Sequence, residues 1–295
     1  MPCLALAAVS TFAGFQVARR GMRWAAGDFV QAAPVSEPID SIKIDSEEFG
    51  WLAPQQQAER LLENAIQRDP LSLERIGLGA GTWLGHLQST DRLFDLVHIA
   101  LNSDDLRVRG AALEIDLAAN NLSKSPETVQ RLVRELRESP GQRPWGLWRL
   151  GALGNRGVEP EVVLAQLLSY AHDRHEQTRF WAVEGLAVLG NDDVIDPLLD
   201  RFAHDPSPRV RQRAACNLAR DGMLTREQRL AAVPHLLNFF DDDALDSATR
   251  GWAYGALRLI TGQALGNDAD AWRKWWATRD AGHKPYSRGK GTLLA

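Results

Sequence analysis

The densest group of titratable side chains lies at residues 172–176, where two histidines and two carboxylates occur together. His172, Asp173, His175 and Glu176 are residue types that bind metal ions or transfer protons. His172 and Glu176 are four residues apart and would share one face of a continuous helix, but a helix boundary is expected between them. We therefore interpret the group as a solvated helix start, with Glu176 favourably placed at the positive end of the helix dipole.

A second acidic group consists of three aspartates at 241–243 and Asp246, between two expected helices. It lacks the glycine and the distal glutamate of an EF-hand loop, so a solvated capping loop is the better interpretation. The sequence has no Gly-x-Ser-x-Gly motif, no phosphate-binding loop and no Cys-x-x-Cys pair, and Cys3 and Cys216 are far apart. We expect no enzymatic activity, no metal and no cofactor.

The elements that carry these groups follow from a recurring pattern, an arginine ahead of a run of small residues and leucine. The arginines lie 34, 34, 36, 32 and 39 residues apart: Arg75, Arg109, Arg143, Arg179, Arg211 and Arg250. A period of roughly 30–40 residues is typical of a solenoid, in which each unit buries its apolar face against its neighbours. The sequence therefore predicts one continuous stack.

Apolar residues recur at i, i+3, i+4 and i+7 from about residue 54 onward, which is the helical period, and no run alternates as a strand does. The predicted fold is all-α: an α-α superhelix over residues 46–279, with about six helix pairs and a capping helix. The expected helices are 54–68, 71–87, 91–101, 106–119, 126–138, 142–153, 160–171, 176–189, 193–203, 207–219, 226–240, 246–260 and 270–278.

The segments 173–189 and 205–215 resemble HEAT repeats, in the short bacterial form also found in phycobilisome lyases. In that family an aspartate precedes the arginine by about six residues, as Asp173 precedes Arg179 and Asp205 precedes Arg211. The carboxylate can cap the second helix, and the arginine can bridge to the capping group of the next unit. The resemblance is clearest over residues 160–262.

The closing segment, with Thr261-Gly262 followed by three tryptophans, is similar to a terminal motif of bacterial HEAT-like proteins. Trp272, Trp275 and Trp276 lie at i, i+3 and i+4 and therefore on one helical face. The end of a solenoid needs a cover over its apolar face, so we expect this helix to be a structural cap.

Large side chains recur two positions after the later repeated arginines, and Trp148 stands five positions after Arg143, where the second helices are expected to face the concave surface. Tryptophan and arginine dominate the energetics of protein interfaces. The predicted partner-binding residues are Trp145, Trp148, Trp181, Arg213 and Trp252. The alternative is that each indole packs between adjacent helices, and the exposure of the tryptophans decides between the two.

Residues 1–45 lie outside the repeats and are expected to form a leader and linker, and residues 280–295 a disordered tail. The apolar run at 4–15 is short for a membrane span and lacks the preceding basic residues of a secretory signal. The expected location is cytoplasmic, with membrane anchoring or export through residues 1–27 as the alternative.

The formal net charge of -4 provides no basic field for nucleic acid. We therefore expect a non-enzymatic scaffold or adaptor that binds a protein or peptide on its concave face, with membrane contact only if the leader is an anchor. The resemblance also implies an alternative, an enzyme or lyase accessory related to phycobilisome lyases or deoxyhypusine hydroxylase. The irons of that hydroxylase need several His-Glu pairs, and this chain has only His175-Glu176.

Overall fold

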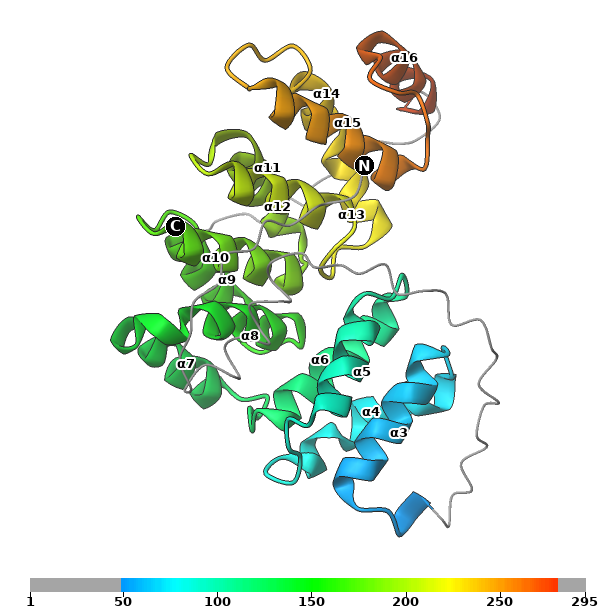
Figure 1. Cartoon of the computed structure of the whole chain (residues 1–295), viewed down its shortest axis with the longest axis vertical. Helices are drawn as coiled ribbons and strands as arrows, with labels where there is room; N and C mark the ends of the chain where they lie inside the picture. The colour runs from blue at the N-terminus through cyan, green and yellow to red at the C-terminus, as the bar shows by residue number, and fades with distance from the viewer. Residues whose placement is uncertain (1–48, 281–295) are drawn as a thin grey trace, which may run out of the picture.

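The computed structural model describes residues 49–280, which form helices and turns without any strand. The helices pack in pairs, and successive pairs stack along a curved axis (Figure 1). The predicted all-α superhelix is therefore confirmed. The expected leader at 1–45, and the expected tail beyond Asp280, lie outside the described residues.

Within that range the helix bounds follow the sequence closely. The first three pairs are α3 (Pro54–Ile66) with α4 (Pro70–Gly79), α5 (Asp91–Leu101) with α6 (Leu106–Ala119), and α7 (Pro126–Glu138) with α8 (Arg143–Asn155). The next are α9 (Pro160–Tyr170) with α10 (Glu176–Leu189) and α11 (Ile195–His204) with α12 (Pro208–Ala219). Then α13 (Arg226–Ala231) and α14 (Val233–Asn238) pack against α15 (Ser247–Thr261), followed by α16 (Ala269–Asp280). Short 3-10 turns are η1 (Ala80–Trp83), η2 (Pro140–Gln142) and η3 (Asp192–Val194).

Two of the expected helices are wrong in extent. The helix expected over 226–240 is divided into α13 and α14, because Pro234 has no backbone N–H with which to continue the helical ladder. The helix expected to reach Leu87 ends at Gly79 and continues only as the turn η1. Glycine is a poor helix former, and Gly77, Gly79 and Gly81 fall in this stretch.

Two of the repeated arginines, Arg179 and Arg211, connect their units to the next. Arg179 donates from Nε and Nη2 to the two carboxylate oxygens of Asp205, at 2.8 and 3.0 Å. Arg211 donates to Asp246 of the following unit at 2.6 Å. Each arginine also donates to a backbone carbonyl of its own loop, at Asp173 and Asp205 respectively. The bridge that the sequence predicted between successive units is confirmed for these two.

Helices α8 and α10 are in direct backbone contact through glycine. A Cβ on Gly151 would lie 2.2 Å from the carbonyl oxygen of Gly185, and one on Gly185 would lie 2.6 Å from the carbonyl oxygen of Leu147. Side chains at these positions would push the two helices apart. The centre of the stack therefore depends on these two glycines.

The last helix covers the end of the core, as predicted. Trp272 is 1% exposed, and Trp275 and Trp276 pack against the same apolar cluster. Asp268 accepts a hydrogen bond from the backbone N–H of Ala271 at 3.0 Å, which caps the helix start.

We expect Gly151→Ala to lower the free energy of unfolding by about 1–3 kcal/mol, because the new methyl group meets backbone atoms that cannot move aside. Urea unfolding followed by circular dichroism measures this. The matched control is Gly251→Ala in α15, where nothing lies within 4 Å of the added Cβ. That change should raise stability by up to about 1 kcal/mol, and equal effects of the two changes would contradict the argument.

We expect Asp205→Asn to lower the free energy of unfolding by about 3 kcal/mol or more. The Asp205 side chain is 0% exposed, and its replacement deprives the Arg179 guanidinium, 9% exposed, of the charged carboxylate to which Nε and Nη2 donate. Glu176→Gln is the control, since its pair with Arg209 is 48% and 44% exposed and should contribute less than about 1 kcal/mol. Urea midpoints that shift alike for both variants would refute the assigned role.

Candidate functional site

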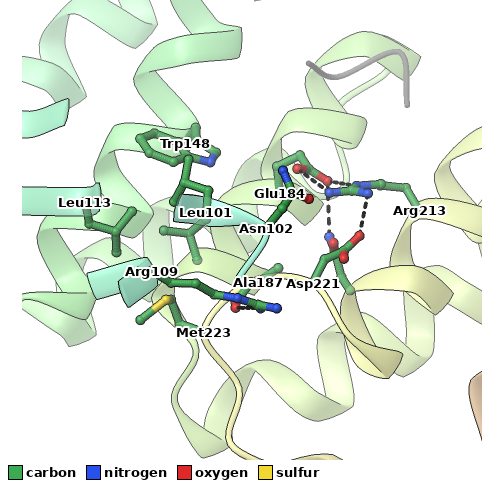
Figure 2. A pocket seen from close by; sticks show the side chains of 13 residues that line it. Leu101, Asn102, Arg109, Leu113, Trp148, Glu184, Ala187, Arg213, Asp221 and Met223 are labelled. Carbon is green, nitrogen blue, oxygen red and sulfur yellow. Dashed lines mark hydrogen bonds and ion pairs between the residues drawn. The ribbon is translucent and has the colours of Figure 1, made fainter. Parts of the chain in front are cut away.

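The middle of the concave side, which the second helices line, is closed by contacts within the chain. Arg109 of α6 donates from Nη1 to the backbone carbonyls of Arg220 and Gly222, at 2.9 and 2.5 Å. These carbonyls belong to the loop after α12, which reaches toward the α5–α6 pair (Figure 1), and Arg109 points into this loop (Figure 2). Helix α10 is buried from Thr178 to Leu189. A partner therefore has no access to α10 along this stretch.

A charged network occupies the same region (Figure 2). Glu184, with a side chain 3% exposed, accepts hydrogen bonds from Arg213 and Asn217. Arg213 also donates to Asp221 at 2.9 Å. Burial opposes the positive charge of Arg213, but the carboxylates of Glu184 and Asp221 outweigh it and raise the pKa of the guanidinium. The expected orientation of Arg213 toward a partner is wrong, because its donors are directed to these internal carboxylates.

The four tryptophans among the predicted partner-binding residues fall into two groups. Trp148 and Trp181 are 2% and 1% exposed, so the prediction that these two side chains face a partner is wrong. The glycine contact brings α8 and α10 so close that these indoles lie in the shared core. Trp145 and Trp252 are half-buried and pack against that core from outside. Trp145 contacts Trp181, with ring centroids 5.2 Å apart.

Trp145 lines a cavity of about 250 Å³ between α5, α6 and α8. The apolar part of the lining includes Phe94 and Val97 of α5 and Trp148 of α8. The described apolar core divides here into two clusters, one formed by α3 to α6 and the other by α6 to α16. The cavity thus lies at the junction between two parts of the stack.

This junction lacks the bridge found further along the chain. Where Asp173 and Asp205 stand six residues before an arginine, the corresponding residue before Arg143 is Arg137. Arg109 therefore has no such aspartate in the next unit, and its Nη1 donates to the loop after α12 instead. Helices α6 and α8 are connected by other pairs, Asp116–Arg149 and Glu114–Arg156, and the cavity lies beside the first of these.

Asp116 and Arg149 form the polar part of the cavity. Arg149 Nε lies 3.9 Å from Asp116 Oδ2, and the side chains are 25% and 21% exposed. Arg149 donates from Nη2 to Asn120, and its guanidinium lies 5.8 Å from the centroid of the Trp145 ring. Burial raises the pKa of Asp116, and Arg149 opposes that shift. Burial lowers the pKa of His98, which also lines the cavity, and Asp95 opposes that shift.

Sequence reasoning found Trp145 and Trp148 but missed the side of the cavity that α5 and α6 supply. In the sequence, Phe94 does not differ from other apolar residues of α5, and Asp116 does not differ from other acidic residues of α6. One feature of the sequence at the junction is Arg137, which stands where the units at 173 and 205 have an aspartate.

The titratable group at 172–176 forms an exposed turn before α10. His172, His175 and Glu176 are exposed, and Asp173 accepts the backbone N–H of His175 at 2.8 Å. Among the described residues, no group of three or more His, Cys, Asp and Glu side chains is arranged to hold a metal ion.

The acidic loop has the capping role expected for it. Asp246 accepts the backbone N–H of Thr249 at 2.8 Å, and Asp242 accepts that of Ala244 at 2.9 Å. The bond from Thr249 to Asp246 caps the start of α15, and the bond from Ala244 to Asp242 lies within the loop.

None of the helices between residues 49 and 280 has the length and apolar composition needed to cross a bilayer. No curated protein and no solved structure matches this chain. Residues 147–219, which run from α8 through α12, match the family model of HEAT repeats. This part of the stack therefore consists of HEAT repeats, as the aspartate–arginine spacing at 173–179 and 205–211 predicted.

Proposed function

We propose that this chain is a non-enzymatic scaffold or adaptor, and that it binds a protein or peptide partner at the cavity between α5, α6 and α8. The observation that carries the proposal is Trp145, a half-buried indole that walls this cavity beside Phe94 and Val97. Partly exposed aromatic side chains beside an apolar pocket are typical anchors of protein interfaces. The match of residues 147–219 to HEAT repeats supports the proposal, since such stacks typically bind proteins.

The cavity is a better candidate than the centre of the concave side. At the centre, Arg213 is bound to Glu184 and Asp221, and α10 is covered. At the cavity, Trp145 keeps part of its surface available beside a space of about 250 Å³. Trp252 stands at the equivalent repeat position near the other end of the stack and does not line this cavity.

We expect peptides selected on the full chain from a random-sequence display library to bind Trp145→Ala at least about 30-fold more weakly than the wild type, the loss typical of an interface anchor. Fluorescence anisotropy with labelled peptides measures the affinities. Trp252→Ala is the matched control and should change them by less than about threefold. Circular dichroism verifies the helix content of each variant. Equal binding by all three proteins, or no enriched peptide, would refute the proposal.

Trp181→Ala should behave differently from Trp145→Ala. Its side chain is 1% exposed, so its removal leaves a cavity in the core and should cost about 3–5 kcal/mol of stability. Thermal unfolding measures this cost. A Trp181→Ala variant as stable as the wild type would show that the indole is not packed as described.

A further inference from the structure

The cavity beside Trp145 combines aromatic walls with one polar end. Phe94 and Val97 come from α5, and Trp145 and Trp148 come from α8. A flat apolar ring fits such walls, because aromatic pairs gain from stacked and edge-to-face contacts as well as from the burial of area. A space of about 250 Å³ is large enough for one ring and too small for a folded element.

The polar end presents an acceptor and a donor close together. Asp116 Oδ2 and Arg149 Nε are 3.9 Å apart and buried, while the two side chains are 21% and 25% exposed through their other atoms. Arg149 is kept in place by Asn120 and by the face of Trp145. A carboxylate accepts and a guanidinium donates, so a group that both donates and accepts suits this end of the cavity.

The charges that line the cavity balance. Asp116 and Arg149 form an ion pair of opposite charges, and burial lowers the pKa of His98 and so disfavours a charge on its ring. A cationic occupant would meet Arg149, which already lies over the Trp145 ring, and an anionic occupant would meet Asp116. The occupant that matches this lining is neutral.

We propose, on the basis of the function proposed above, that this cavity binds a tyrosine side chain of the partner peptide. The ring packs against Trp145 and Phe94, and the hydroxyl donates to Asp116 and accepts from Arg149. A hydroxyl is suited to this place because it is both donor and acceptor. Indole only donates, and a carboxamide has no aromatic ring.

The first test titrates p-cresol and toluene into the full chain by ligand-observed NMR. The two probes differ by the hydroxyl, so p-cresol should bind at least about tenfold more tightly than toluene. Asp116→Ala should bring the two affinities within about twofold, while Val97→Trp, which fills the cavity, should abolish both. Trp252→Ala is the control and should change neither. Equal affinities in the wild type, or no saturable binding of either probe, would overturn the proposal without the use of any variant.

The second test uses the peptides selected on the wild type, with each tyrosine replaced by phenylalanine. At least about tenfold weaker binding of the phenylalanine peptides, lost in Asp116→Ala, would support the tyrosine assignment. Peptides that depend on Trp145 but not on tyrosine would overturn the assignment and leave the scaffold function standing. If p-cresol binds tightly but no peptide is selected, the cavity binds a phenol that does not belong to a peptide. That result would overturn both the tyrosine assignment and the scaffold function.

Discussion

The later part of the stack depends on how the guanidinium groups of the repeated arginines Arg179 and Arg211 are satisfied. A partly buried guanidinium needs several acceptors, and Arg179 finds them in its own loop and in Asp205 of the next unit. Because one side chain bonds to both units, it holds them in a defined orientation as well as at a defined distance. Arg211 repeats the arrangement with Asp246. The helix pairs from α9 onward are joined by this contact and by the apolar core beneath it.

The same requirement explains where the stack changes. Between α6 and α8 no aspartate is available to Arg109, so this arginine bonds to carbonyls of the loop after α12. One consequence is a contact between the second helix pair and a loop more than a hundred residues later, which closes the middle of the concave side. A cavity between α5, α6 and α8 lies in the same part of the stack, where the core divides into two clusters.

Backbone contact through glycine then determines which of the large side chains are buried. Gly151 and Gly185 let α8 and α10 approach so closely that Trp148 and Trp181 lie in the core. Trp145 stays half-buried because it faces the junction where no neighbouring helix comes so near. A repeat position therefore does not have one fixed environment. The exposure of a side chain at that position depends on the distance to the next unit. Small residues and bridging ion pairs together determine this distance.

The sequence by itself determined the all-α class, the stacking of helix pairs, most helix bounds and the bridging role of the arginines. These follow from local periodicity, capping residues and a spacing repeated along the chain, all of which can be read without knowing distant contacts. Only the tertiary structure decided which tryptophans are buried, that Arg213 bonds internally and that Asp116 and Arg149 meet beside Trp145. Those outcomes depend on the distance between helices and on contacts as remote as Arg109 with Gly222, which no local pattern encodes.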